Sequence, residues 1–291
     1  MSRRFDVYAP LLDFYWAGQD FALSHDVTIK RFDDAPSLLG LESSASRPEW
    51  QRATQSDHWL TFSWVEATDP DPAEVINLVL LSLWLVKPIR SQVALWFEMN
   101  RDRTADGNTF SRVLDRFAWI PGTIDPDIKT SDLRLASFHY RALEALYKAR
   151  GRLSNAIVLT VAGCWSHGWQ TALICHASAA ETILTYATGR GLTRRLATSY
   201  ACIVASDTSG RDAAYKEFVD LYSARSDIVH GRMHNITKND TLPTLIRFQN
   251  LMRRLWTAVL GSGPLTSALE LDDSRRAAHL LPLQSGYTAP A

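Results

Sequence analysis

The chain has 291 residues, of which 46% are hydrophobic, 21% are charged and 10% are aromatic, and 31 basic residues balance 31 acidic ones. A chain of this length can bury a full core without disulfide or metal cross-links, and its composition excludes a globally disordered protein. At about 100–200 residues per domain, the length predicts two domains.

The net charge of zero conceals an uneven distribution along the chain. Residues 1–150 contain 17 Lys and Arg against 21 Asp and Glu, a net charge of −4, whereas residues 190–256 contain 11 against 6, a net charge of +5. Overall neutrality argues against a protein that binds a polyanion over its whole surface. The basic segment nevertheless leaves room for nucleic-acid binding by the C-terminal half.

Cysteine usage and hydropathy indicate where the chain resides. Three cysteines without a CxxC pair, at 164, 175 and 202, fit reduced thiols in the cytosol. Met1–Arg4 is followed by Phe5-Asp-Val-Tyr-Ala-Pro10, which is no apolar signal region. The most apolar run, Val75–Val86, is shorter than the roughly 20 helical residues that cross a bilayer. We therefore expect a cytoplasmic protein with no membrane partner.

Residues 1–125 are predicted to form a mixed, β-rich domain. Phe21–Lys30, His58–Val65 and Val93–Glu98 mix β-branched and aromatic residues with partial alternation, as strands do. Pro72 opens a predicted helix after a turn-rich stretch. Seven of the ten tryptophans precede residue 120, where they form either a core or an aromatic ligand-binding surface.

A break at Ile120–Pro126, with two prolines and a glycine, separates this domain from a helical one. Beyond it, apolar residues recur with the period of a helix. The predicted helices cover Leu135–Ala149, Leu153–Ala162, Trp169–Ala187, Leu192–Ala205, Ala214–Val229 and Leu245–Val259. The fold class is therefore α+β, with a helical domain over residues 131–260 and a loosely ordered tail over 265–291.

One segment of the helical domain carries residues suited to chemistry on RNA. Arg225 and His230 lie within six residues, at a helix end that Gly231 closes. A guanidinium presents a planar fork to phosphate oxygens, and an imidazole exchanges a proton near neutral pH. Four further arginines offer electrostatic attraction for a polyanion, namely Arg232, Arg247, Arg253 and Arg254. These residue types suit cleavage of RNA without a metal cofactor.

Helix geometry constrains how Arg225 and His230 act together. Positions five apart on an ideal helix point about 140° apart. The two side chains meet in one pocket only if the helix end distorts or if a partner chain brings them together. We therefore expect a composite site.

The segment resembles a known superfamily. Arg225, four intervening residues and His230 match the Arg-x4–6-His motif of the HEPN superfamily, and Leu221–Gly231 looks like its ApeA-like branch. Upstream, Ala179–Leu184 and Leu192–Ala197 are similar to two core helices of that branch. The similarity covers roughly residues 131–260 and implies an α-helical bundle that pairs into a homodimer.

The resemblance also implies roles for individual residues. Arg225 corresponds to the phosphate and transition-state ligand, and His230 to the general acid or base. Ser226 corresponds to a variable polar position after the arginine, and Glu181 to an acidic position that orients a motif residue. Asp227 lies within the motif and is grouped with the RNA-binding residues. The implied activity is an endoribonuclease that leaves a 2′,3′-cyclic phosphate and a 5′-hydroxyl, in anti-phage defence or a toxin-like role.

Other readings of the same residues remain open. The motif also fits a non-catalytic RNA- or nucleotide-binding or assembly module, in which the N-terminal domain senses a trigger or an antitoxin. Arg225 and His230 can equally be hydrogen-bonded within a bundle core, and Glu181 can be an ordinary salt-bridge residue. His230 and His234 have the i, i+4 spacing of zinc ligands on a helix, and Cys164, His167, Cys175 and His176 could gather around a metal. We expect buried thiols and a core histidine there, and no metal or other cofactor.

Overall fold

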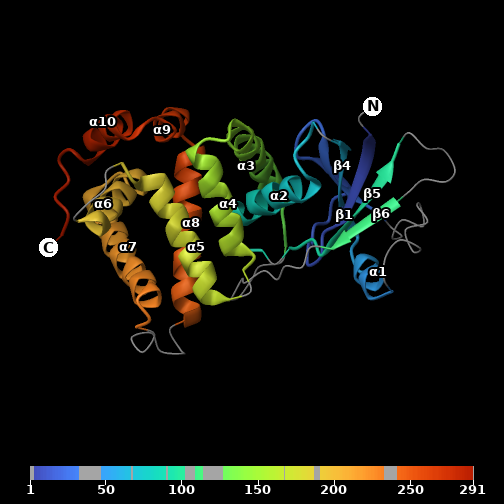
Figure 1. Ribbon diagram of the computed structural model, residues 1–291, viewed down its shortest axis with the longest axis horizontal. Coiled ribbons are helices and arrows are strands. Elements are labelled where there is room, and N and C mark those ends of the chain that lie inside the picture. Colours follow the sequence, from blue (N-terminus) through green and yellow to red (C-terminus); the bar gives the residue numbers. More distant parts are fainter. Residues whose placement is uncertain are drawn as a thin grey trace. The chain divides into compact units, whose positions relative to one another are not determined.

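The structure is a computed structural model that describes residues 3–32, 47–66, 68–89, 91–101, 109–113, 127–166, 168–186, 191–232 and 241–290. Its contacts divide the chain into two compact units, Met1–Glu144 and Ala145–Ala291. The first unit contains an antiparallel sheet and the second is helical in its described part (Figure 1). The α+β fold class is therefore confirmed.

The sheet of the first unit has six antiparallel strands in the order β2-β3-β4-β1-β5-β6. The strands are β1 (Arg4–Pro10), β2 (Asp20–Ala22), β3 (Val27–Arg31), β4 (His58–Val65), β5 (Leu95–Asn100) and β6 (Thr109–Val113). Strand β1 was not predicted from the sequence, although it is central and pairs with both β4 and β5. The stretch predicted as one strand, Phe21–Lys30, is a hairpin, because the Ser24 hydroxyl accepts a hydrogen bond from the Val27 amide at 3.2 Å and turns the chain.

Both faces of the sheet are covered, because apolar residues alternate between them. Trp59 and Phe97 stack on one face at 6.1 Å between ring centroids, beneath Trp50 of α1 (Arg47–Ala53). Ile29 and Leu60 are fully buried on the opposite face. Figure 1 shows α1 on one side of the sheet and α2 (Pro72–Val86) on the other. The tryptophans Trp59, Trp84 and Trp96 are buried, so these three build the core.

Helix α2 corresponds to the most apolar run of the sequence. It begins where the Asp71 carboxylate accepts a hydrogen bond from the Ala73 amide at 2.8 Å, with Pro72 in its first turn. Its residues Leu78 to Leu85 are buried without interruption. Within the described ranges, no helix combines the length and the apolar character needed to cross a membrane.

Helix α3 (Thr130–Ala149) spans the boundary between the units and corrects two predictions. The helix itself was predicted, but Leu135 and Phe138 of its expected core face are 45% and 47% exposed. Instead, Ser137 is buried and its hydroxyl donates to the Leu23 carbonyl of the first unit at 2.7 Å. The buried face of α3 is built mainly from Leu133, Ala136, Tyr140 and Leu143. Residues 130–144 of α3 belong to the first unit, whereas the helical domain was predicted to start at residue 131.

The second unit is a helical bundle, as predicted. Its main helices are α4 (Arg152–Cys164), α5 (Trp169–Leu184), α6 (Leu192–Val204), α7 (Thr208–Val229) and α8 (Thr241–Leu260). Figure 1 shows α4, α5 and α8 side by side. The fully buried Trp256 of α8 donates its indole N–H to the Thr160 hydroxyl of α4 at 2.9 Å, which fixes the two helices in register.

The C-terminal segment 265–291, expected to be a loosely ordered tail, is largely helical. It contains most of α9 (Gly263–Leu269) and all of α10 (Asp273–Gln284). Arg276 is 1% exposed and donates to the Leu271 carbonyl at 2.9 Å. Between the two helices, the Glu270 carboxylate accepts from the backbone amides of Arg152 and Leu153 at 2.7 and 3.0 Å. The segment therefore caps the start of α4, an interaction between residues more than 100 positions apart.

The cap predicts a stability effect. Replacing Glu270 by Ala leaves the first amides of α4 without their acceptor and removes a negative charge from a helix start. We expect the Glu270→Ala variant to lose about 1–2 kcal/mol of unfolding free energy, measured in urea. Asp57→Ala, which removes an exposed carboxylate of the first unit, serves as the control. Equal stability of Glu270→Ala and the wild type would contradict the cap.

The buried histidine of α5 predicts a pH dependence. His176 is fully buried against Gly163 of α4, and burial lowers its pKa to about 3. Unfolded His titrates at about 6.5, so below that pH the unfolded chain binds a proton that the folded chain rejects. We therefore expect the unfolding free energy to fall by about 2 kcal/mol between pH 7 and pH 5 through this residue. Urea unfolding of His176→Leu should lack that part of the slope, and an unchanged slope would refute the assignment.

Candidate site at the end of helix α7

The Arg225–His230 motif occupies the last turn of α7. Asp207 caps the start of the helix, where its carboxylate accepts from the Gly210 amide at 2.9 Å, and His230 caps the end. The His230 amide still donates to the Ser226 carbonyl at 3.0 Å, and Gly231 then adopts a left-handed conformation with φ of 69°. Because glycine adopts this conformation without steric penalty, Gly231 ends the helix directly after the histidine.

Arg225 is held by two residues from different helices. Its Nη2 lies 3.3 Å from Oε1 of Glu181 on α5, and its guanidinium lies 5.6 Å from the centre of the Tyr222 ring. The Tyr222 hydroxyl donates to the same Glu181 oxygen at 2.6 Å. Burial and then the bond to Glu181 raise the Tyr222 pKa, so the hydroxyl stays protonated and keeps donating. We call Glu181, Tyr222 and Arg225 the α5–α7 cluster.

The Arg225 guanidinium keeps unused hydrogen-bonding capacity within this cluster. The side chains of Arg225 and Glu181 are 26% and 25% exposed. Among the described residues, the buried Nε of Arg225 has no hydrogen-bond acceptor. A guanidinium has five N–H donors, and Glu181 engages one end of it. The remaining donors suit a phosphate oxygen, for which Glu181 both positions the arginine and competes with the ligand.

His230 lies apart from the α5–α7 cluster. Its side chain is exposed at the helix end, next to Val229, which is 48% exposed. No hydrogen bond or ion pair joins it to Arg225 within the described structure, as expected from the divergence of positions five apart on a helix. Within the described part of one chain, Arg225 and His230 are therefore not joined by a direct contact.

The other motif residues form a local network that closes the helix end. Arg232 donates from Nε to the Asp227 carboxylate at 2.9 Å and from Nη2 to the Ser226 hydroxyl at 3.4 Å. The Arg232 amide also donates to the Asp227 carbonyl at 2.7 Å. Asp227 and Arg232, both predicted to bind RNA, thus bind each other, and Ser226 joins them rather than Arg225.

The predicted RNA-binding arginines of α8 are also engaged by neighbouring groups. Arg247 forms an ion pair with Asp220 of α7 at 2.8 Å, and Arg254 pairs with Glu217 one turn earlier on α7. Burial lowers the pKa of Arg254, but the interactions with Glu217 and Tyr200 together outweigh burial, so the pKa is raised. The two pairs join α7 and α8 along their exposed edge, and each carboxylate competes with a polyanion for its arginine.

Arg253 differs from its neighbour because it lies on the inner side of α8. Its guanidinium is partly buried next to Cys164 of α4, and burial lowers its pKa. The Cys164 thiol is fully buried, which raises its pKa well above the ordinary value. Arg253 thus points toward the bundle interior. Of the arginines predicted to bind RNA, it is the one least suited to contact RNA directly.

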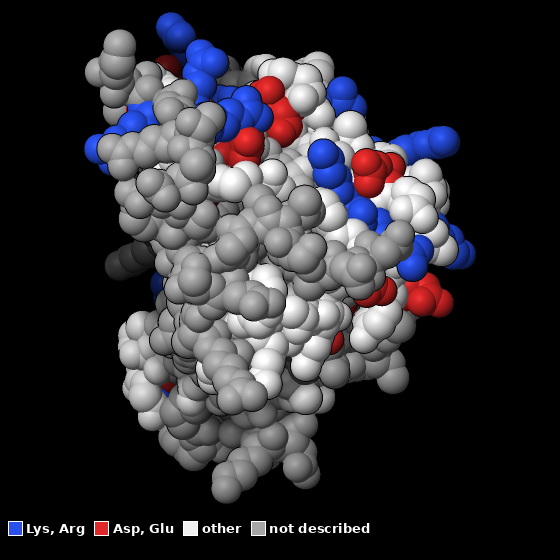
Figure 2. Space-filling model, turned by 90° about the vertical axis from the view of Figure 1, so that its right-hand side faces the viewer, with Lys and Arg blue, Asp and Glu red and all other residues white. Residues whose placement is uncertain are grey.

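The surface charge of the strand-rich side can be followed in Figure 2. That view faces the right-hand side of Figure 1, and it places Lys and Arg side chains beside Asp and Glu side chains. The described part of this face therefore carries both signs of charge. The net −4 of residues 1–150 does not produce one continuous acidic surface there.

The spacings considered for metals produce no cluster among the described residues. No group of three or more His, Cys, Asp or Glu side chains there is arranged to hold a metal ion. Cys164 and His176 are buried in the core, while His167 and His234 lie outside the described residues. The reading of His176 as a core histidine is confirmed by its burial.

Tyr222 is the site residue that sequence reasoning missed. It lies within the predicted helix Ala214–Val229 but was given no role in the site. Its position three residues before Arg225 places it on the same side of α7, one turn earlier. That spacing was available in the sequence, but the shared partner Glu181 comes from α5 and was not predictable as a contact.

Comparisons of the chain with protein-family models, with curated proteins and with solved structures find no match.

The α5–α7 cluster predicts measurable coupling between two of its residues. In a double-mutant cycle of Glu181→Ala and Arg225→Ala, we expect a coupling energy of about 1 kcal/mol in urea unfolding, because the pair is largely shielded from water. The matched pair Asp220 and Arg247 has side chains 63% and 48% exposed. There we expect less than about 0.5 kcal/mol. Equal coupling in both cycles would show that the cluster is no more than a surface ion pair.

Proposed function

We propose that this chain is a metal-independent endoribonuclease of the HEPN type that acts as a homodimer, in anti-phage defence or a toxin-like role. The observation that carries the proposal is the last turn of α7. It presents a partly buried arginine, fixed by Glu181 and Tyr222, and an exposed histidine at the helix end. An oriented cation and an accessible imidazole are the two groups that metal-free phosphodiester cleavage requires.

The proposed reaction is transfer of the RNA phosphodiester from the 5′-oxygen to the adjacent 2′-oxygen. The 2′-hydroxyl loses its proton to a base as its oxygen attacks phosphorus, and the bond from phosphorus to the 5′-oxygen breaks. A proton is delivered to that leaving oxygen, which gives a 2′,3′-cyclic phosphate and a 5′-hydroxyl. His230 serves as the general acid or base, and the free donors of Arg225 stabilise the negative charge that develops on the phosphoryl oxygens.

A dimer follows from the same proposal. Arg225 and His230 of one chain diverge, so the phosphate has to lie between the arginine of one chain and the histidine of another, or between two facing motifs. Two-fold symmetry would then create two equivalent sites. Arg232, Arg247 and Arg254 would guide the RNA toward these sites, with Asp227 released from Arg232 when RNA binds. Arg253 would contribute only to the local positive potential.

The first unit is assigned a regulatory part in this proposal. It holds its own sheet and core and is a separate compact unit. A trigger or an antitoxin bound through residues 1–125 would control access of RNA to the helical unit. The basis of this assignment is the division of the chain into two units.

A specific observation also favours a second function, a non-catalytic RNA-binding or assembly module. The Arg225 guanidinium faces a carboxylate at 3.3 Å, and Arg247 and Arg254 have carboxylate partners as well. In such a module the same arginines would bind phosphates or a second chain without cleavage. Cleavage with defined product ends distinguishes the two functions.

The proposal predicts cleavage of labelled RNA by the purified full chain in the presence of EDTA, with 2′,3′-cyclic phosphate ends. We expect His230→Ala to lower the rate by about 10²–10⁴-fold and Arg225→Ala by at least about 10²-fold. Arg275→Ala, which removes an exposed arginine of α10, should cleave like the wild type. RNA binding without cleavage by the wild-type chain would instead support the non-catalytic module.

Mixing the two inactive variants tests the composite site. If each site combines Arg225 of one chain with His230 of its partner, half of the dimers formed from an equal mixture are mixed, and each mixed dimer has one intact site. The mixture should therefore regain about one quarter of the wild-type activity. No recovery, although subunits demonstrably exchange, would mean that each site takes both groups from one chain.

A further inference from the structure

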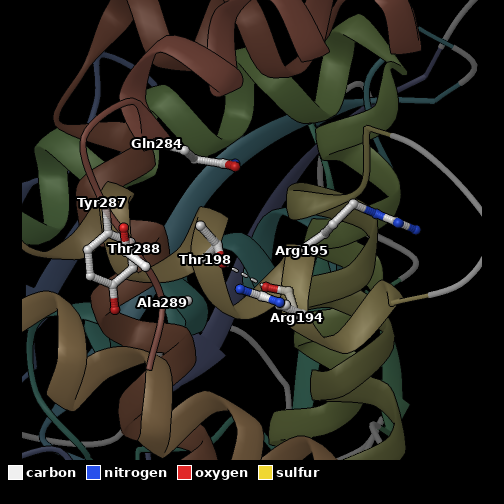
Figure 3. A pocket seen from close by; sticks show the side chains of 7 residues that line it. All are labelled: Arg194, Arg195, Thr198, Gln284, Tyr287, Thr288 and Ala289. Carbon is white, nitrogen blue, oxygen red and sulfur yellow. Dashed lines mark hydrogen bonds between the residues drawn. The ribbon is translucent and has the colours of Figure 1, made fainter. Parts of the chain in front are cut away.

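A hollow of about 350 Å³ lies in the helical unit, away from the residues assigned to RNA cleavage. One side is formed by the first turns of α6, with Arg194, Arg195 and Thr198. The other is formed by Gln284 of α10 and by Tyr287–Ala289 beyond it, as Figure 3 shows. Ligand sites commonly measure about 300–1,000 Å³, so this hollow accommodates a small ligand rather than a large cofactor.

The charge of the hollow is positive and is not balanced by the acidic residues of the unit. Its lining contains two arginines and no acidic residue. The described acidic residues of the second unit already have partners, and only Asp212 has its partner, the Tyr287 hydroxyl, in the wall of the hollow; the others are Glu181, Asp207, Glu217, Asp220, Asp227, Glu270, Asp272 and Asp273. Arg194 is exposed and its guanidinium forms no ion pair or hydrogen bond with a described residue. Its positive charge therefore remains available to a ligand.

The position of Arg194 in the first turn of α6 also favours a bound anion. A cation in the first turn of a helix is electrostatically unfavourable, and this turn holds two arginines and no acidic residue. Local arrangements that run against such a preference tend to mark functional sites. An anion bound between the first turn of α6 and the C-terminal segment would remove the conflict.

The opposite wall offers a fixed aromatic ring and polar groups. The Tyr287 hydroxyl donates to the Asp212 carboxylate at 3.0 Å, and the Arg211 guanidinium lies 6.0 Å from the ring centre. The Gln284 amide donates to the Ser199 hydroxyl at 3.0 Å, which fixes its orientation and leaves its second N–H. The hydroxyls of Thr198 and Thr288 also line the hollow. A ring and several hydrogen-bonding groups exceed what a bare phosphate ion requires.

We propose that this hollow between α6 and Tyr287–Ala289 binds a nucleoside phosphate. The phosphate lies on Arg194, the Thr288 hydroxyl bonds a sugar or phosphate oxygen, and the base packs beside the Tyr287 ring. The Thr198 hydroxyl donates to the Arg194 carbonyl at 2.8 Å and can accept a hydrogen bond from a sugar hydroxyl. Figure 3 shows Arg195 extending away from Tyr287, so it supplies positive potential rather than a direct contact. The site shares no residue with the proposed ribonuclease site, and each proposal can fail without the other.

Isothermal titration of the full chain with ADP, AMP, adenosine and inorganic phosphate tests the proposal. We expect ADP and AMP to bind with Kd below about 1 mM, and adenosine and phosphate alone to bind at least about tenfold more weakly. Arg194→Ala should weaken ADP binding at least about tenfold, because a charge-assisted contact is lost. Tyr287→Leu should weaken ADP more than inorganic phosphate.

Matched controls keep the result interpretable. Arg134→Ala removes an equally exposed arginine from α3 and should bind ADP like the wild type, and urea unfolding without ligand verifies that each variant is folded. The proposal is overturned if no nucleotide binds below about 1 mM or if Arg194→Ala binds as tightly as Arg134→Ala. Equal affinity for adenosine and AMP would also overturn it. The proposal is also overturned if a short RNA binds through Arg194 while mononucleotides do not bind. The hollow would then belong to an RNA-binding surface.

Discussion

The Glu181 carboxylate ties the candidate site to the bundle. One of its oxygens accepts the Tyr222 hydroxyl and faces the Arg225 guanidinium, so a single group on α5 fixes two residues of α7. A partly buried guanidinium needs such a partner, because removing a charge from water is unfavourable unless another charge compensates it. The same contact also opposes binding of a phosphate to Arg225. A phosphate that approaches Arg225 meets the donors that Glu181 leaves free, and it meets the negative charge of Glu181 as well.

Ion pairing explains how a basic segment coexists with a neutral protein. Residues 190–256 carry a net charge of +5, yet Arg232, Arg247 and Arg254 are each bound to a carboxylate of α7. Two of these pairs hold α8 against α7, the third closes the end of α7, and all three screen the positive potential in the absence of a ligand. Binding of a polyanion would then involve exchange of partners, with strong dependence on salt concentration. Arg194, at the start of α6, has no carboxylate partner among the described residues, so a ligand binds it without displacing one.

The C-terminal segment connects the stability of the helical unit with its second candidate site. Glu270 caps α4, Arg276 is buried beneath the chain that leads from α9 to α10, and Gln284 and Tyr287 continue onto α6 and α7. The hollow beside Arg194 exists only because this segment folds back over α6. Its wall is thereby built from residues almost 100 positions away from the arginines, and a change in the segment would affect both the cap and the hollow.

Sequence patterns alone were enough to predict the α+β class, the positions of the bundle helices and the place of the motif at a helix end. Those features are local: apolar periodicity marks the helices, and Gly231 follows the histidine directly. Tertiary structure decided what depends on distant partners. It made Arg4–Pro10 the centre of the sheet, turned Ser137 rather than Leu135 toward the core, and ordered the C-terminal segment through Glu270. It also gave Arg225 the partners Glu181 and Tyr222 and left His230 apart, because contacts between helices arise from packing that no local pattern encodes.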